Sequence, residues 1–326
     1  MSLKEEKGEQ EQNEKIAILL MAYGSPQNLD EVEPYLTHIR HGRKPSREEL
    51  EDLRRRYAAI GGISPLLKIT LSTASRLEDR LRSRGYAGIS VFAGMKHSRP
   101  FISEVVKQIA SKGISRVVAI ALAPHFSRMS VGEYQDAVRR ANEQLENKME
   151  LHFIDQWYSN PIFVEKWANK IIEARNKYFS GKSVFHIFTA HSLPERIIQL
   201  DDPYRDQLYE SSRSIASLLN LKENEYDFAF QSAGHMSEPW LGPDILDKIN
   251  SLRKEKNYPE NLLVVPIGFV SDHLEILYDI DIEAREFANK LGLRLERTNL
   301  FNDSDDMIEI LESVLKEKSS ILREQS

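Results

Sequence analysis

Short apolar segments alternate with longer amphipathic segments along most of this 326-residue chain. The apolar segments are rich in Val, Ile and Phe, and most lack the polar alternation of a half-exposed strand, so they are typical of buried parallel strands. They occupy residues 16–22, 89–94, 117–123, 151–154, 184–190, 228–231 and 262–267. Helix-like segments occupy residues 47–58, 66–84, 101–111, 131–145, 161–177, 204–219, 243–254, 272–290 and 305–318. This alternation predicts an α/β fold with parallel sheets flanked by helices.

The length of the chain favours two domains, because domains commonly contain about 150 residues. The predicted strands fit two doubly wound, Rossmann-like halves, and we expect an N-terminal domain at 15–125 and a C-terminal domain at 126–300. Residues 1–14 are almost entirely polar, which predicts a disordered tail rather than a signal peptide. The sequence leaves open whether the last helix, within 301–320, packs back on the first domain.

Composition excludes several classes of function. The net charge is −6, from 44 basic and 50 acidic residues, and no basic stripe is visible, which argues against a nucleic-acid-binding protein. The chain has no cysteine, so disulfides, cysteine zinc sites and iron–sulfur clusters are excluded. No apolar run approaches the roughly 20 residues that span a bilayer. We therefore expect a soluble, cytoplasmic protein.

Distinctive polar residues follow the predicted strands. Tyr23, His97, His125 and His191 each come directly after, or shortly after, an apolar segment. Ligand sites of open parallel sheets lie beyond the carboxyl ends of the strands, so these side chains are predicted to converge on one cleft. Neither G-x-G-x-x-G nor G-x-x-x-x-G-K-[ST] occurs, which argues against a nucleotide cofactor.

The predicted helix at 272–290 carries three carboxylates at four-residue spacing. Glu275, Asp279 and Glu283 would form one narrow stripe, and isoleucines flank it on both sides. This pattern indicates a buried carboxylate ladder that faces an internal cavity, where a passing divalent cation would offset the repulsion between like charges. The alternative is a capping box of Asp272 and Glu275, with the other two carboxylates in solvent.

His191 combines the two properties of imidazole, as a metal ligand and as a base near neutral pH. It stands at the end of a predicted strand before a Pro-containing turn, although a structural histidine bonded to backbone remains an alternative. His97 and His125 are better explained as structural or supporting residues, and His273 has no distinctive context. One histidine with one carboxylate would form a weak site that suits a metal to be handed on, such as Fe²⁺ or Zn²⁺.

A basic and aromatic region lies near the N-terminus. Arg40 belongs to a short basic turn, and Arg56 with Tyr57 precedes the Gly-rich segment that contains Ser64. Guanidinium groups bind carboxylates bidentately, so these arginines are candidates for binding an acidic ligand. The alternative is solvated helix charge followed by a turn.

Taken together, these segments resemble the ferrochelatases, closest to the soluble Gram-positive bacterial branch that uses coproporphyrin III. The similarity runs from about residue 16 to the C-terminal helix. The matching motifs, in order, are A-Y-G-S-P around Tyr23, Y-A-A-I-G-G-I-S-P-L from Tyr57, L-A-P-H-F-S from Leu122, A-H-S-L-P-E around His191, Q-S-A-G from Gln231, W-L-G-P-D from Trp240 and P-I-G-F-V-S-D-H-L-E-I-L-Y-D from Pro266.

The resemblance implies two chelatase-type domains with a porphyrin cleft between them. His191 and Glu275 would bind incoming Fe²⁺ on one face of the macrocycle, with Asp279 and Glu283 relaying metal or protons, and Tyr23 would lie on the opposite face. The other positions matching porphyrin contacts are Arg40, Arg56, Tyr57, Ser64 and Tyr134. His41 departs from the family, which often has a second arginine there, so we expect the binding of porphyrin carboxylates to differ.

The expected activity is insertion of Fe²⁺ into a porphyrin in haem biosynthesis, by a monomer with no permanently bound cofactor. His191 would accept a pyrrole proton and bind the metal, and the enzyme would bend the porphyrin ring. The sequence does not decide between coproporphyrin III and protoporphyrin IX. Two alternatives remain, a porphyrin or haem carrier without turnover and a Co²⁺ or Ni²⁺ chelatase for another tetrapyrrole.

Overall fold

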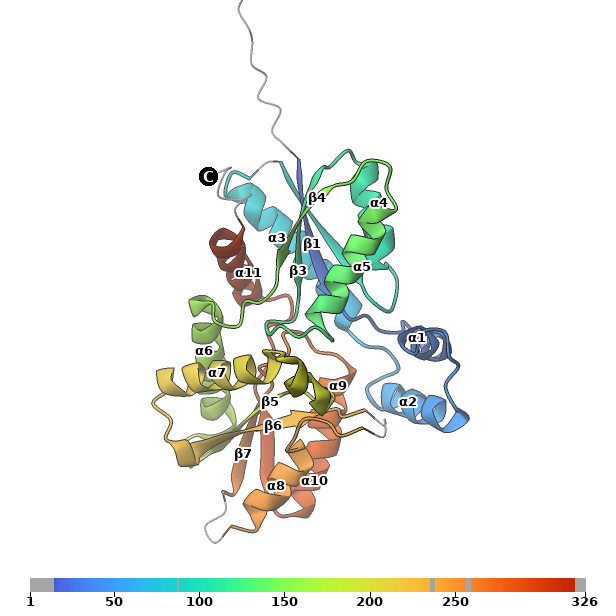
Figure 1. The fold of residues 1–326 in the computed structure, drawn as a ribbon. Helices are drawn as coiled ribbons and strands as arrows, with labels where there is room; N and C mark the ends of the chain where they lie inside the picture. Colours follow the sequence, from blue (N-terminus) through green and yellow to red (C-terminus); the bar gives the residue numbers. More distant parts are fainter. Residues whose placement is uncertain (1–14, 87, 235–237, 256–258, 320–326) are drawn as a thin grey trace, which may run out of the picture.

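The computed structural model describes residues 15–86, 88–234, 238–255 and 259–319, and it contains two four-stranded parallel sheets (Figure 1). The two sheets follow one another along the chain, and both are flanked by helices. This arrangement confirms the predicted α/β fold with two Rossmann-like halves. The predicted disordered tail at 1–14 lies outside the described residues.

The first sheet has the strand order β2-β1-β3-β4. Its central strand β1 is buried along its whole length, as expected for an unbroken apolar segment covered on both faces. The strands are β1 (Ile16–Ala22), β2 (Ile89–Met95), β3 (Arg116–Ala121) and β4 (Glu150–Ile154). The flanking helices are α3 (Leu66–Ser83), α4 (Ile102–Ser111) and α5 (Val131–Glu143).

The predicted domain boundary near residue 125 falls inside this first unit. β4 pairs with β3 in parallel from Arg116 opposite Glu150 to Ile120 opposite Ile154. Because a strand belongs to the sheet that satisfies its backbone hydrogen bonds, the first half extends through β4, and the boundary at 125 is wrong. The sequence predicted this strand at 151–154 but does not indicate which sheet it joins, because the pairing forms with a strand about thirty residues earlier.

The second sheet has the order β6-β5-β7-β8. Its strands are β5 (Phe185–His191), β6 (Tyr226–Gln231), β7 (Asn261–Val265) and β8 (Arg294–Arg297). The helices of this half are α6 (Pro161–Phe179), α7 (Tyr204–Leu218), α8 (Ile245–Arg253), α9 (Leu274–Leu277), a π-helical segment η4 (Asp279–Ala284) and α10 (Arg285–Lys290). β8 has one apolar residue, Leu295, among charged neighbours, and therefore gave no apolar segment in the sequence.

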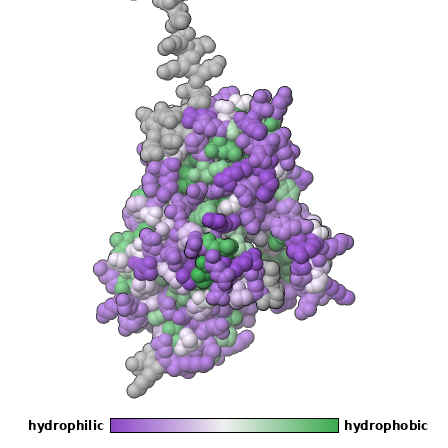
Figure 2. Space-filling model, in the orientation of Figure 1, coloured by the Kyte–Doolittle hydropathy of each residue, from purple (hydrophilic) through white to green (hydrophobic). Residues whose placement is uncertain are grey.

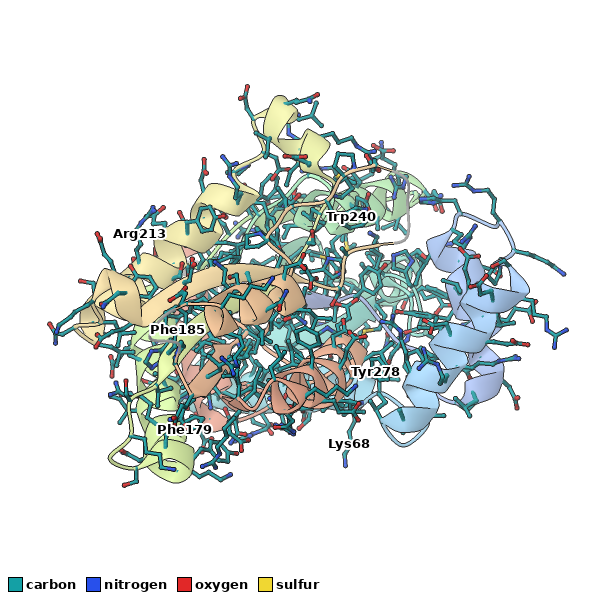
Figure 3. The ribbon with its side chains drawn as sticks, turned by 90° about the horizontal axis from the view of Figure 1, so that it is seen from below. Lys68, Phe179, Phe185, Arg213, Trp240 and Tyr278 are labelled. Carbon is teal, nitrogen blue, oxygen red and sulfur yellow. The ribbon has the colours of Figure 1, made fainter. Side chains whose placement is uncertain are left out.

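Two helices of the first half project sideways and reach the second half (Figure 1). These are α1 (Val32–Ile39) and α2 (Arg47–Ala59). Arg55 of α2 donates to the hydroxyl of Tyr278 at 3.2 Å, and the Arg56 guanidinium lies 5.2 Å from the centre of the Tyr278 ring. Figure 3 shows Tyr278 beside these helices. Short 3₁₀ segments in the described part of the chain are η1 (Leu29–Glu31), η2 (Glu195–Leu200) and η3 (Glu223–Glu225).

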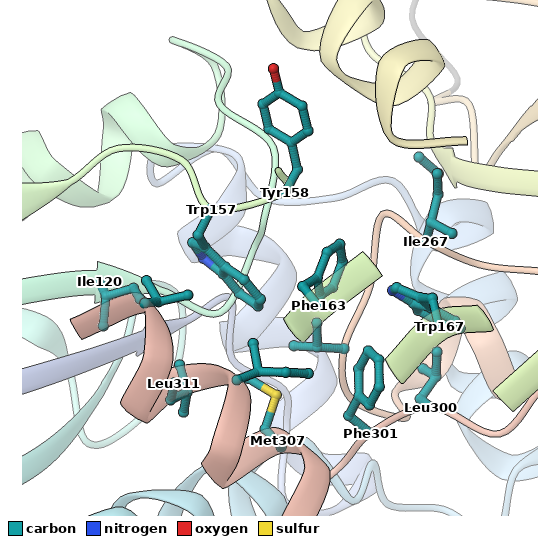
Figure 4. Packing of buried hydrophobic residues seen from close by; sticks show 14 of the residues in the cluster. Ile120, Trp157, Tyr158, Phe163, Trp167, Ile267, Leu300, Phe301, Met307 and Leu311 are labelled. Carbon is teal, nitrogen blue, oxygen red and sulfur yellow. The ribbon is translucent and has the colours of Figure 1, made fainter. Parts of the chain in front are cut away.

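An aromatic core connects the halves with the last helix, α11 (Asp305–Lys318). The rings of Trp167 and Phe301 lie 4.8 Å apart between centroids, and Met307 and Leu311 of α11 belong to the same buried cluster (Figure 4). On its polar side, α11 is bound to α3 through Arg80, whose Nε lies 2.7 Å from Oε2 of Glu312. The last helix thus packs against the first half.

The surface in the view of Figure 2 is largely hydrophilic, with apolar side chains gathered in small areas. Within the described part of the chain, no helix combines the length and apolarity that crossing a membrane requires.

Candidate functional site

His191 is the last residue of β5, and two hydrogen bonds fix its environment. Its Nδ1 lies against the carbonyl oxygen of Ser192, which can only accept, so Nδ1 carries a proton and donates. The hydroxyl of Tyr204 donates to the backbone carbonyl of His191 at 3.0 Å. With Nδ1 occupied, Nε2 is the ring atom available for a metal or a proton, which is the usual way a backbone acceptor selects the ligating nitrogen.

Glu275 lies between two imidazoles. Its Oε1 is 3.4 Å from Nε2 of His191, and its Oε2 is 3.3 Å from Nε2 of His273. His273 repeats the arrangement of His191, because its Nδ1 donates to the carbonyl of Ser271 at 2.9 Å. Both rings therefore direct Nε2 toward one carboxylate, which forms a His191–Glu275–His273 cluster.

The cluster is tied to the sheet through Gln231 at the end of β6. The side-chain amide of Gln231 donates to the backbone carbonyl of Glu275 at 3.0 Å, and Thr189 of β5 donates to its amide oxygen at 2.9 Å. Gln231 and Thr189 are fully buried. Their hydrogen bonds therefore fix the position of α9 relative to the ends of β5 and β6. The carboxyl ends of β5 and β6 thus position both the histidine and the glutamate.

Opposite charges hold the cluster in an ionised form. Burial alone would lower the pKa of His191, but the charge and the hydrogen bond of Glu275 outweigh it and raise that pKa to about 9. Burial would likewise raise the pKa of Glu275, but His191 and His273 hold the pKa of this carboxyl well below its usual range. In the resting protein, a protonated His191 therefore faces an ionised Glu275.

The carboxylate ladder predicted for the following helix is only partly realised. Asp279 is buried with 5 % of its surface exposed, but the Glu275 side chain is 30 % exposed and Glu283 is exposed, so the expectation of three buried carboxylates is confirmed for Asp279 alone. The cause is a π turn: the N–H of Glu283 donates to the carbonyl of Tyr278, five residues earlier, at 2.9 Å. The extra residue in that turn changes the helical phase, so the four-residue spacing no longer defines one stripe.

Asp279 is the second carboxylate of the site and contacts residues of both halves. Ser232 donates to its Oδ2, and Nη1 of Arg56 from α2 lies 3.4 Å from its Oδ1. Burial, together with the negative charge of Glu275, raises the pKa of Asp279 to about 7 despite these contacts. Asp279 therefore changes its protonation near neutral pH.

Aromatic residues of the first half face the same glutamate. Burial raises the pKa of Tyr57 and Tyr134, and the negative charge of Glu275 raises the pKa of these two and of Tyr23, so all three phenols lie within its electrostatic range. Tyr23 follows β1 and is 40 % exposed, while Tyr57 and Tyr134 are buried. The Lys96 ammonium lies 5.7 Å from the Tyr23 ring and 5.5 Å from the Tyr134 ring. Residues of both halves thus contribute to the surroundings of Glu275.

Comparison with known proteins agrees with this geometry. The ferrochelatase family model matches residues 15–319. The chain belongs to the ferrochelatase family. Its relatives include the ferrochelatase of Herpetosiphon aurantiacus, which is 46 % identical over 92 % of this chain and 98 % of the relative. A coproporphyrin III ferrochelatase of a Geobacillus species is 42 % identical over 92 % of this chain and 97 % of the relative.

Solved structures support the same fold for this ferrochelatase. SirB from Bacillus subtilis superimposes with a TM-score of 0.55 at 11 % identity, covering 95 % of this chain and 98 % of SirB. CbiX, a terminal enzyme of sirohaem biosynthesis in denitrifying bacteria, gives a TM-score of 0.51 at 10 % identity, covering 94 % of this chain and all 100 % of CbiX. At such low identity, these similarities concern the two-sheet chelatase fold alone.

Two residues expected to contact porphyrin have local partners in this ferrochelatase. Arg40 forms an ion pair with Glu49, and buried Ser64 accepts a hydrogen bond from the N–H of Leu66 at 3.3 Å where α3 begins. Within the described ranges, no hydrogen bond or ion pair joins either residue to the His191–Glu275 pair. Among the described residues, His191 and Glu275 thus contact each other directly, whereas the bonds of Arg40 and Ser64 are local.

The capping-box alternative for Glu275 is not found. His273 occupies the N-cap position of α9 without a side-chain cap bond, and Asp272 instead binds Arg297 and Asn302. Sequence reasoning also missed His273, although its place two residues before Glu275 was a usable signal. Among the residues that the structure describes, no group of three or more His, Asp or Glu side chains is arranged to hold a metal ion.

Proposed function

We propose that this ferrochelatase inserts Fe²⁺ into a porphyrin in haem biosynthesis, with coproporphyrin III as its substrate. Membership of the family supports the activity, and relatives named coproporphyrin III ferrochelatase support the choice of porphyrin. The main structural observation is Glu275 between two imidazoles that both present Nε2. Nitrogen and carboxylate ligands suit ferrous iron, and few of them hold it weakly enough to be passed on.

The reaction exchanges one dication for two protons: Fe²⁺ and a porphyrin with two pyrrole N–H groups give iron porphyrin and two H⁺. No electron is transferred, because iron stays ferrous. In our proposal, Fe²⁺ approaching Glu275 replaces the imidazolium of His191 as the charge partner of the carboxylate. His191 then loses the interaction that raises its pKa and releases its proton, and its Nε2 lone pair can bind iron or accept a pyrrole proton.

Asp279 and Glu283 would guide Fe²⁺ toward the site and carry protons away from it. Buried Asp279 has a pKa of about 7, so it can alternate between attracting a cation and carrying a proton. Glu283 is exposed and lies one turn further along the helix. We propose that metal enters and protons leave along this pair, with Arg56 limiting the negative charge around Asp279.

The porphyrin would lie between Tyr23 of the first half and the cluster of the second half. We propose contacts to the macrocycle from Tyr23, Tyr57 and Tyr134, and contacts to its carboxylates from Arg40 and Arg56, with Ser64 at the Gly-rich turn. Porphyrin distortion would lower the barrier to metal entry by a few kcal/mol.

A spectroscopic assay with two porphyrins tests this proposal. The purified protein is mixed with Fe²⁺ and either coproporphyrin III or protoporphyrin IX without oxygen, and the absorption bands of the metal-free porphyrin are followed. We expect turnover with both and a higher kcat/KM with coproporphyrin III. A shifted spectrum without turnover would identify a porphyrin or haem carrier instead. Faster insertion of Co²⁺ or Ni²⁺ into another tetrapyrrole would identify a different chelatase.

The resemblance to this enzyme family also underlies the remaining parts of the proposal. We propose that the protein is a lyase that acts as a monomer in the cytoplasm. It would need no permanently bound cofactor, because Fe²⁺ is a substrate. The absence of cysteine from the sequence is consistent with an enzyme that has no iron–sulfur cluster.

A further inference from the structure

The segment that carries His273 and Glu275 has little local support. α9 contains only four residues, its N-cap residue His273 makes no side-chain cap bond, and the π segment follows directly. α9 is the first turn of a helical stretch that continues through the π segment to Lys290, and its uncapped start leaves backbone donors unsatisfied. The position of Glu275 between its two imidazoles must therefore be fixed from elsewhere in the fold.

Arg297, at the end of β8, supplies that support. Its Nε and Nη2 bind the two carboxylate oxygens of Asp281, both at 2.9 Å, and Nη2 also binds Oδ1 of Asp272 at 3.0 Å. The Arg297 side chain is only 11 % exposed, and the side chains of Asp272 and Asp281 are 20 % and 22 % exposed. A bidentate guanidinium–carboxylate pair in such a place is geometrically specific.

Asn302 completes the grip on Asp272. Its side-chain amide donates to Oδ2 of Asp272 at 2.7 Å, and its amide oxygen accepts from the backbone N–H of Asp272, also at 2.7 Å. Asp272 directly precedes His273, and Asp281 lies within the π segment beyond Glu275. Arg297 and Asn302 therefore hold both ends of the segment from 272 to 281.

We propose that Arg297 is a positioning residue for metal insertion, which keeps His273 and Glu275 in register with His191 by joining Asp272 to Asp281. The inference rests on the proposed function. Arg285 offers a matched comparison, because it also contacts Asp281, with Nη2 at 3.4 Å from Oδ1, but binds Glu296 instead of Asp272. Loss of Arg297 should disturb the segment, whereas loss of Arg285 should leave its start in place.

The test compares Arg297→Met with Arg285→Met in the full-length protein. Amide hydrogen exchange at residues 274–278 should become faster in Arg297→Met and stay unchanged in Arg285→Met. With coproporphyrin III and Fe²⁺, kcat should fall by about tenfold or more in Arg297→Met, with the porphyrin KM within about twofold, as for other residues that orient metal ligands. Arg297→Lys keeps the positive charge but cannot bind Asp281 bidentately, so its kcat should lie between those of Arg297→Met and the wild type.

Asn302→Gly is a second variant in case Arg297→Met does not fold. Asn302 has φ of 52°, which glycine adopts freely, so this change removes the side-chain bonds to Asp272 without backbone strain. Unchanged exchange at 274–278 in these variants would overturn the positioning role, and so would faster exchange with an unchanged kcat. If the wild type inserted no metal, the proposed function would fail, while the exchange experiment would still decide whether Arg297 holds the segment.

Discussion

His191 Nε2 and Glu275 Oε1 lie 3.4 Å apart, and this pair joins the end of β5 to the start of the acidic helix. A further hydrogen bond holds each residue in place. His191 donates from Nδ1 to the Ser192 carbonyl, and the backbone carbonyl of Glu275 accepts from the Gln231 side chain. Because both side chains are held in place, a metal ion could replace the proton of His191 with little movement of either side chain. Three predictions test the roles of residues at this pair, and a fourth concerns the buried His125.

Replacement of His191 by alanine should abolish metal insertion, with kcat lower by about 100-fold to 10,000-fold, because the variant loses both a ligand and a proton acceptor. Porphyrin binding, measured by quenching of tyrosine and tryptophan fluorescence, should remain within a few-fold of wild type. His152→Ala is the control, because His152 is a partly exposed residue of β4 that pairs with Glu150 away from the cluster. Retained turnover in His191→Ala would refute the assignment.

Replacement of His273 by alanine should lower kcat by about tenfold to 100-fold, because Glu275 loses one of its two imidazole partners. The KM for porphyrin should change little. His273→Gln, which can still donate to the carboxylate, should retain more activity than the alanine variant. Equal activities of the two variants, or of the alanine variant and wild type, would contradict a role for this hydrogen bond.

Replacement of Asp279 by asparagine should lower kcat/KM for Fe²⁺ by about tenfold, because the neutral amide no longer attracts a cation toward Glu275. The hydrogen bond from Ser232 can still be accepted by the amide oxygen, so the fold should be preserved. Varying Fe²⁺ at saturating porphyrin measures the effect. Glu286→Gln, at an exposed acidic residue of α10, controls for the loss of one negative charge. A change in the porphyrin KM alone would exclude the relay.

His125 makes the folded protein sensitive to acid. It is 2 % exposed, stacks on Tyr158, and has no hydrogen-bond partner for either ring nitrogen among the described residues. Burial lowers its pKa to about 3, from 6.5 in an exposed position. The unfolded chain therefore binds the proton more readily, so this contribution to stability is complete above pH 6.5 and is lost progressively as the pH falls toward 3.

His125→Phe should remove this sensitivity while keeping the stacking. Between pH 7 and pH 5, the free energy of unfolding of the wild type should fall by up to about 2 kcal/mol more than that of the variant. Urea unfolding at both values measures the difference. His152→Gln should behave like wild type, since His152 is partly exposed. An identical loss of stability in wild type and His125→Phe would show that His125 is protonated or solvated in the folded state.

Much of the fold was predictable because buried parallel strands leave a strong local signal. Seven predicted strand segments overlap β1 to β7, and the predicted helices overlap the long helices of both halves. β8 was missed because a four-residue edge strand needs only one apolar residue. α1 was missed for a similar reason, since only Val32 and Tyr35 of this helix are buried.

The site was predicted in part. His191 was recognised from its place after an apolar strand, and Glu275 from the carboxylate spacing and the family resemblance. The pairing of Asp279 with Arg56 was not predictable, because it joins α2 to a helix more than two hundred residues away in the sequence. Arg297 was not recognised either, because its contacts with Asp272 and Asp281 are visible only in the folded structure.

The sequence by itself determined the two parallel sheets, the strand end that bears His191 and the acidic segment that bears Glu275, because burial and periodicity act over a few neighbouring residues. Only the tertiary structure decided where the first half ends, that Glu283 faces solvent and that His273 is the second partner of Glu275. The pairing of β4 with β3 forms only when distant strands come together, whereas the π turn and the contact between His273 and Glu275 join nearby residues in a geometry that regular helical spacing does not predict.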